Sequence, residues 1–191
     1  VTAATYVDAF DISSQEFNPQ GFTFSNDGTK MFLTGNNGDD VNEYTLSTGF
    51  DVSTASFVDS FDISSQEEGP RDLAFNADGT KMFVVGVLGD DVNEYTLSTA
   101  FDVSTSTFVD SFDISSQEDS PTGLAFSKDG TKMFVAGNGG DDINEYTLST
   151  AFDVSTASFV DSFDVSSQDT APNGLTFNSC LLYTSDAADD P

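Results

Sequence analysis

Acidic side chains with an intervening Asn recur three times in this chain, and their residue types could hold a metal ion. In the first copy, Asp39 and Asp40 precede Asn42 and Glu43 within GNNGDDVNEY. Hard cations such as Ca²⁺ prefer several carboxylate and amide oxygens as ligands. The pattern therefore suggests a calcium site in each copy, with these candidate ligands: Asp39, Asp40, Glu43, Asp90, Asp91, Glu94, Asp141, Asp142 and Glu145.

A structural interpretation of the same acids stays open. Their spacing matches neither the EF-hand loop nor the glycine-rich nonapeptide that binds Ca²⁺ in parallel β-helices. An Asp side chain can also accept a hydrogen bond from a backbone N–H two residues later and so close a tight turn. Ca²⁺ is the one cofactor that the sequence suggests, and the alternative is that the chain binds none.

The chain lacks the residues that the common kinds of enzyme catalysis require. The chain contains no His, and its one Cys is Cys180. Ser-His-Asp and Cys-His catalysis and His-ligated zinc are therefore excluded within this chain. Paired carboxylates could hydrolyse glycosides, but the candidate acids recur in every copy, whereas an active site needs unlike groups at one place. We therefore predict that the chain is not an enzyme.

The acidic loops belong to a repeat of fixed length. The turns at Asp27-Gly28, Asp78-Gly79 and Asp129-Gly130 are 51 residues apart, and residues 61–111 and 112–162 are identical at 39 of 51 positions. A constant period of this length is typical of a repeat architecture, in which each copy forms one structural unit. Each copy is therefore expected to fold in the same way.

One copy contains four runs rich in Val, Phe, Tyr, Ile and Thr, at 124–126, 132–137, 143–148 and 159–165. Such runs favour β-strands, and the Asp129-Gly130 turn between the first two supplies the positive φ of a hairpin. Four strands in about fifty residues are typical of one blade of a β-propeller. An open array of β-hairpins is the alternative architecture.

The hairpin sequences support the propeller. FSNDGTKMFL, FNADGTKMFV and FSKDGTKMFV resemble the first hairpin of the YVTN, TolB-like and NHL-like propeller families, which reads F-S-x-D-G. This resemblance implies an all-β fold, a β-propeller fragment of about three four-stranded blades plus partial blades at both ends. It does not select a function, because these families include scaffolds, binding modules and enzymes.

Both ends of the chain cut through a repeat. Tyr6–Ser13 matches a fourth strand without a preceding blade, and Leu175–Phe177 matches a first strand without a following hairpin. The tail CLLYTSDAADD resembles a translated sequencing adapter, so we expect a fragment of a longer repeat protein. The expected units are a partial blade and loop at 1–20, blades at 21–71, 72–122 and 123–173, the start of a further blade at 174–179, and a non-native tail at 180–191.

The charge of the chain limits its partners. It carries 33 acidic and 5 basic residues, a net charge of −28. Phosphate backbones are bound by clusters of Lys and Arg, so we expect no nucleic-acid partner, and no apolar run is long enough for membrane insertion. A protein or glycan partner and an extracellular, cell-surface or virion location are expected, while the oligomeric state stays open.

These observations favour a non-enzymatic propeller module that acts as a scaffold or multivalent binding segment. The alternative is a fragment of a propeller enzyme, lactonase-like or glycan-active, whose catalytic residues lie outside the fragment. The loop before each first strand varies most between copies, so ligand choice is expected there. Arg71, the single Arg, is expected to pair with a nearby acid among Glu67, Glu68 and Asp72.

The sequence leaves open which way three acidic side chains of the fourth strands point. Under strict alternation, Asp59, Asp110 and Asp161 fall on the same face as the flanking Phe residues. A buried carboxylate without a partner is costly. Either a β-bulge turns these side chains outward or each finds a partner.

Overall fold

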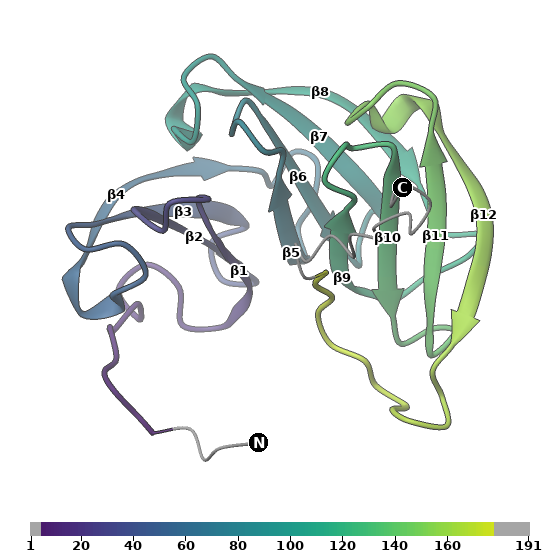
Figure 1. Cartoon of the computed structure of the whole chain (residues 1–191), viewed down its shortest axis with the longest axis horizontal. Coiled ribbons are helices and arrows are strands. Elements are labelled where there is room, and N and C mark those ends of the chain that lie inside the picture. Colours follow the sequence, from purple (N-terminus) through teal and green to yellow (C-terminus); the bar gives the residue numbers. More distant parts are fainter. Residues whose placement is uncertain (1–4, 178–191) are drawn as a thin grey trace, which may run out of the picture.

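Three four-stranded antiparallel sheets of one design make up the computed structural model, which describes residues 5–177 (Figure 1). Blade 1 consists of β1 (Pro19–Phe24), β2 (Lys30–Gly35), β3 (Asp40–Leu46) and β4 (Ala55–Asp62). Blade 2 consists of β5 (Pro70–Phe75), β6 (Lys81–Gly86), β7 (Asp91–Leu97) and β8 (Ser106–Asp113). Blade 3 consists of β9 (Pro121–Phe126), β10 (Lys132–Gly137), β11 (Asp142–Leu148) and β12 (Ala157–Asp164).

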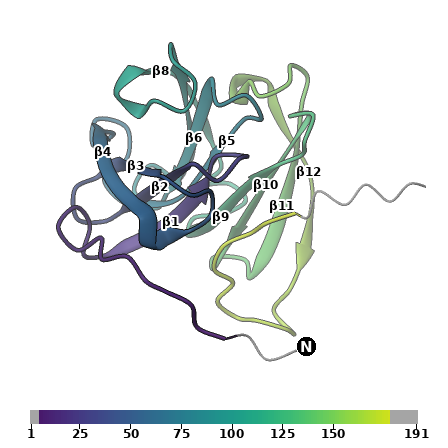
Figure 2. The same ribbon diagram turned by 60° about the vertical axis from the view of Figure 1, so that its left-hand side comes forward.

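The strands within each blade follow one another in sequence order, each pairing with the next. Between the third and fourth strands lies a single 3₁₀ turn: η1 (Val52–Thr54), η2 (Val103–Thr105) and η3 (Val154–Thr156). None of these helices is long or apolar enough to cross a membrane. The first strands β1, β5 and β9 lie side by side, and the sheets fan outward from them (Figures 1 and 2). The expected all-β propeller fragment is confirmed.

The Asp-Gly hairpin forms as its sequence predicts. Gly28 adopts a φ of +70°, and the Asp27 carboxylate accepts hydrogen bonds from the backbone N–H and hydroxyl of Thr29. A Cβ on Gly28 would lie 2.4 Å from a ring carbon of Phe50. Both the backbone conformation and the space beneath the aromatic ring therefore require glycine at this turn.

A β-bulge resolves the position of the fourth-strand acids. In blade 1, Glu43 pairs with Asp59, whereas the next residue, Tyr44, pairs with Phe57. Val58 is therefore the extra residue of the fourth strand, and the alternation of its side chains shifts at that point. Asp59 is exposed as a result. The same shift occurs in blades 2 and 3, so the bulge turns these acids outward.

Aromatic side chains join each blade to the next. Tyr95 is fully buried, with its ring centroid 5.7 Å from Phe61 of blade 1 and 5.8 Å from Phe108 of its own blade. Phe83 of blade 2 and Phe126 of blade 3 have centroids 4.4 Å apart. Burial of such large apolar side chains is the main favourable term in packing. The third-strand Tyr is therefore an inter-blade core residue.

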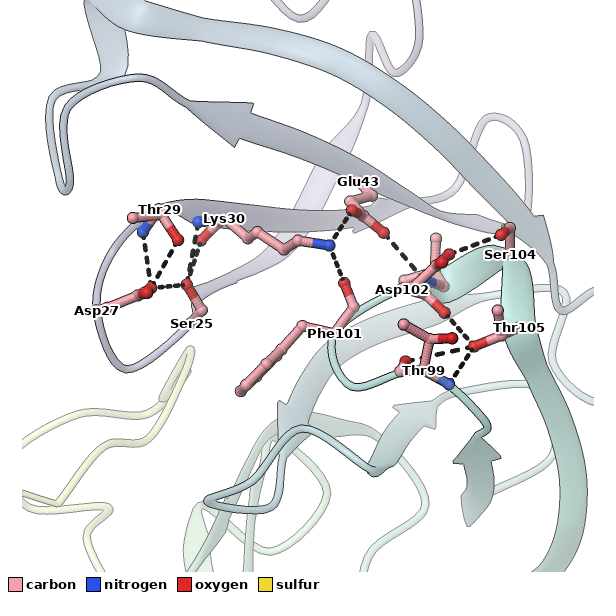
Figure 3. Close-up of polar contacts among 11 residues, drawn as sticks. Ser25, Asp27, Thr29, Lys30, Glu43, Thr99, Phe101, Asp102, Ser104 and Thr105 are labelled. Carbon is pink, nitrogen blue, oxygen red and sulfur yellow. Dashed lines mark hydrogen bonds and ion pairs between the residues drawn. The ribbon is translucent and has the colours of Figure 1, made fainter.

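An ion pair adds a polar link between blades, which we call the blade clamp (Figure 3). Lys30 Nζ lies 2.6 Å from Glu43 Oε1 and donates to the carbonyl of Phe101 in blade 2 at 2.6 Å. Glu43 Oε2 accepts a hydrogen bond from Val103 N at 3.0 Å. Phe101 adopts a φ of +57°, which is strained for a bulky residue. The clamp thus holds the strained turn of one blade against the sheet of the previous one.

The two terminal segments differ from the sequence-based expectation. Tyr6–Ser13 forms no strand, although Phe10 packs on Tyr44 with centroids 5.7 Å apart. Leu175–Phe177 also forms no strand, although the ring centroids of Phe177 and Phe134 lie 4.6 Å apart. A strand needs a hydrogen-bonded neighbour, and the described residues provide none for these segments. The predicted adapter-derived tail at 180–191 lies outside the described residues.

Candidate functional site

The loop before each first strand varies most between copies, and one of its variable positions differs in all four. It follows the Pro that begins β1, β5 and β9 and that recurs as Pro172, and it carries Gln20, Arg71, Thr122 and Asn173. All four residues line a single cavity of about 800 Å³. Ligand sites in proteins commonly measure about 300–1,000 Å³. The starts of β1, β5 and β9 and the segment that contains Asn173 therefore bring four unlike polar side chains together at a cavity large enough for a small molecule.

The walls of this cavity, which we call the strand-end cavity, are mainly uncharged. Arg71 and Asp72 are the charged residues among those that line it. Aromatic surface is provided by Phe22 and Phe24, and further polar groups come from neighbouring loops. Most of the side chains that line the cavity are therefore polar, and they can exchange hydrogen bonds with a polar ligand.

Arg71 has no carboxylate partner within 4.0 Å among residues 5–177. Its Nη1 donates to Gln20 Oε1 of blade 1 at 2.9 Å. With the Asn36 amide oxygen facing the guanidinium, Nη1 also donates to it at 3.2 Å. The predicted pairing with Glu67, Glu68 or Asp72 is wrong, because the side chain reaches toward blade 1 and binds amide oxygens. Its charge is therefore free to meet a ligand.

Asp72 stands where the other copies have glycine, at Gly21, Gly123 and Gly174. Its Oδ1 accepts from Leu73 N at 2.9 Å, and its Oδ2 accepts from Leu124 N of blade 3 at 2.9 Å. Burial raises the pKa of the carboxyl to about 6, against the opposing effect of these two hydrogen bonds. The inner strands thus hold a carboxyl that titrates near neutral pH.

The glycine in blade 1 makes room for Asp72. A Cβ on Gly21 would lie 2.6 Å from Asp72 Cα and 2.9 Å from its Oδ1. Asp72 was not among the site residues predicted from the sequence. The signal that could have found it is an acid in one copy at a position that is glycine in the others.

Six of the nine predicted calcium ligands have side-chain partners of their own. The glutamates each lie 2.6 Å from a Lys Nζ of the neighbouring strand: Glu43, Glu94 and Glu145. The second Asp of each pair accepts a hydrogen bond from the following Asn side chain: Asp40, Asp91 and Asp142. The first Asp of each pair adopts a φ of 48–50°: Asp39, Asp90 and Asp141.

The structure therefore does not assemble the suggested calcium site. Within residues 5–177, no three Asp, Glu, His or Cys side chains gather in a group that could hold a metal ion. Glu43 and Glu94 belong to the blade clamps, whereas Glu145 pairs with Lys132 of its own blade. The aspartates shape the loop. Calcium binding by these loops stays a prediction from the sequence.

A second set of acids, in the loops before the first strands, is buried: Glu16, Glu67 and Glu118. Glu67 accepts hydrogen bonds from the backbone N–H groups of Gly69, Leu88 and Gly89, at 2.6, 3.2 and 3.1 Å. It ties the loop before β5 to the loop after β6. Because its oxygens are engaged by the backbone, we assign it a structural role, and the same contacts recur at Glu118.

Solved structures of propellers resemble this chain. A protein of Bacteroides uniformis, provisionally named a 6-phosphogluconolactonase, matches 75% of this chain and 40% of its own length, with a TM-score of 0.57 and 16% identity. The periplasmic gluconolactonase of Pseudomonas aeruginosa matches 77% of this chain and 41% of its own, with a TM-score of 0.52 and 20% identity. The Cps50 (Swd1) β-propeller domain of Myceliophteria thermophila matches 77% of this chain and 43% of its own length, with a TM-score of 0.52 and 13% identity.

These likenesses show the propeller fold, and the chain spans about 40% of the length of the structures it matches. No protein-family model matches the chain, and no curated protein matches its sequence. The finer resemblance to the YVTN, TolB-like and NHL-like families therefore stays a prediction.

The prediction that the chain is not an enzyme is contradicted by these neighbours, two of which are named as lactonases. That prediction relied on the absence of His and on acids repeated in every copy. It overlooked the non-repeating pair Arg71 and Asp72, which the fold places at one cavity with unlike polar groups. Unlike groups at one place are what an active site needs.

Proposed function

We propose that this chain is part of a propeller enzyme that hydrolyses a sugar lactone, with the strand-end cavity as the substrate site. The observation that carries the proposal is the convergence of four unlike side chains from one repeat position: Gln20, Arg71, Thr122 and Asn173. A scaffold of near-identical blades has no need for such differences at the same cavity. The lactonase names among the structural neighbours support the reaction class.

The charges of the cavity favour an uncharged lactone over a phosphorylated one. The charged groups among the lining residues are one guanidinium, at Arg71, and one carboxyl, at Asp72. A phosphate dianion would find a single positive partner and the repulsion of a chain with a net charge of −28. Amide and hydroxyl groups from Gln20, Thr122 and Asn173 suit the hydroxyls of an unmodified sugar ring.

Substrate binding through Arg71 can be tested with a matched pair of variants. Arg71→Gln introduces the residue that blade 1 carries at the same position, and we expect it to weaken binding about tenfold, a typical effect of losing one charge-assisted hydrogen bond. Lys128→Gln removes the same charge on an exposed turn and should leave binding unchanged. Calorimetry with gluconolactam, a ring analogue that resists hydrolysis, measures the binding constants on the whole chain.

Hydrolysis of δ-gluconolactone and its 6-phosphate, followed in a pH-stat, completes the test. We expect turnover above the buffer rate, with the unphosphorylated lactone preferred. Absence of both turnover and lactam binding would contradict the proposal. Equal weakening in Arg71→Gln and Lys128→Gln would show that only the overall charge matters and would remove the cavity as the binding site.

A further inference from the structure

We propose that Asp72 is the catalytic proton acceptor of the strand-end cavity and activates the water that attacks the lactone carbonyl. This inference rests on the proposed function and deepens it by assigning the reacting group. It also changes the sequence-based alternative, which placed the catalytic residues outside this chain.

The position of Asp72 fits this role. It lies at the inner strand β5, lines the strand-end cavity and also borders the adjoining space beside β9. Backbone N–H groups of Leu73 and Leu124 each hold one carboxylate oxygen at 2.9 Å. A carboxylate oxygen can accept more than one hydrogen bond, so the remaining lone pairs can receive a water proton while the side chain stays fixed.

The ionisation of Asp72 suits a base at neutral pH. Its pKa is raised to about 6 by burial, so it is mainly a carboxylate at pH 7 and close enough to neutrality to exchange a proton readily. Among residues 5–177, no side-chain nitrogen of a Lys or Arg lies within 4.0 Å of its carboxylate oxygens. Its proton affinity is therefore not suppressed by an ion pair.

Other described acids are less suited. Glu94 is committed to a Lys and to a backbone N–H of the next blade. Glu67 is occupied by three backbone N–H groups. Asp78 serves an exposed turn, where a hydrogen bond from the Thr80 hydroxyl lowers its pKa. Asp72 is the acid that lines the strand-end cavity.

The chemical step balances without a further reactant. Asp72 takes one proton from water as the water oxygen bonds to the lactone carbonyl carbon, and the carbonyl electron pair moves onto its oxygen. The guanidinium of the preceding residue, Arg71, lines the same cavity and can stabilise this oxyanion. The carbonyl re-forms, the bond to the ring oxygen breaks, and Asp72 returns its proton to that oxygen. Lactone and water thus yield the hydroxy acid.

A purely structural role is the competing explanation, because Asp72 also ties β5 to β9. Asp72→Asn keeps an acceptor and nearly the same size but cannot take the proton, whereas Asp78→Asn is a matched change at an exposed acid. We expect Asp72→Asn to lower kcat/KM for δ-gluconolactone at least 100-fold with less than threefold change in gluconolactam binding. Asp78→Asn should retain the wild-type rate, which should rise with pH through about 6.

A second readout does not depend on turnover. The folded pKa of about 6 lies above the ordinary value of 3.8, so folding takes up a proton between these values. This stabilisation is present below about pH 4 and is lost as the pH rises through about 6. The melting temperature of the wild type should therefore fall relative to that of Asp72→Asn between pH 4 and 7.

The outcomes separate the two proposals. If the wild type hydrolyses the lactone and Asp72→Asn retains its rate, the role of Asp72 is overturned while the proposed function stands. A pH-independent difference between the two melting temperatures would also overturn that role, because Asp72 would then titrate as an ordinary Asp. If the wild type neither hydrolyses the lactone nor binds the lactam, the proposed function and this inference both fail.

Discussion

Replacing Lys81 by Met should destabilise the protein by about 2–3 kcal/mol, whereas Lys132→Met should cost less than about 1 kcal/mol. Both residues occupy the same repeat position and pair with a Glu at 2.6 Å. Their surroundings differ, because blade 3 covers the first pair. The difference between the two variants therefore measures the effect of burial on two equivalent ion pairs.

Burial explains the larger cost. Lys81 and Glu94 have side chains that are 26% and 2% exposed, against 48% and 30% for Lys132 and Glu145. Removing Lys81 leaves the buried Glu94 carboxylate with Val154 N as its remaining partner, and an uncompensated buried charge typically costs about 3–5 kcal/mol. We lower this figure because water reaches Lys81. Loss of its bond to the Phe152 carbonyl adds to the effect.

Thermal and urea unfolding measure the contrast. A loss of 2–3 kcal/mol corresponds to about 4–12 °C in melting temperature for a chain of this size. The isosteric change Glu94→Gln serves as a control, because the amide oxygen can still accept from Val154 N and no buried carboxylate is left without its Lys. Equal losses in Lys81→Met and Lys132→Met would show that the clamps do not depend on the neighbouring blade.

Replacing Glu67 by Ala should destabilise the protein by about 3 kcal/mol, while Glu68→Ala should change stability by less than about 0.5 kcal/mol. Glu67 is 1% exposed and accepts hydrogen bonds from Gly69, Leu88 and Gly89. Its neighbour Glu68 is exposed. Removing the shared acceptor leaves donors without partners at the junction of two loops, and each buried unsatisfied group typically costs about 1–3 kcal/mol.

The packing of Glu67 against Gly86 adds to the free-energy cost of its removal. A Cβ on Gly86 would lie 2.2 Å from the Glu67 carboxyl carbon, so the side chain packs directly on the glycine backbone. Glu67→Ala leaves a cavity there, whereas Glu67→Gln keeps the volume and one acceptor oxygen and should fall between the wild type and the Ala variant. Hydrogen exchange of Leu88 and Gly89 gives a local readout. Unchanged protection of these amides in Glu67→Ala would contradict the assigned role.

The Lys–Glu pairs and the buried glutamates at the position of Glu67 recur every 51 residues, whereas Arg71 and Asp72 each occur in one copy only. The recurring acids maintain each blade and its contact with the next. The single pair lies at the cavity that the blades share. In this chain, residues that occur in one copy only therefore indicate a candidate active site better than the acidic residues that occur in every copy.

The sequence by itself determined the blade. The 51-residue period, the Asp-Gly turns and the β-branched and aromatic runs predicted four strands per copy, and residues 132–137 form β10 as expected. These signals are local: a turn needs a residue that tolerates positive φ, and a strand needs side chains suited to a pleated surface. Each copy contains all of them, so the fold could be predicted without knowledge of its neighbours.

Only the tertiary structure decided what the polar residues do. Gln20 and Arg71 are 51 residues apart, yet their side chains share a hydrogen bond at the cavity. Lys81 and Lys132 have the same sequence surroundings but different exposure. The burial that raises the pKa of Asp72 comes from adjoining strands. Desolvation and convergence depend on which atoms of other blades lie nearby, and that information is absent from the pattern of a single repeat.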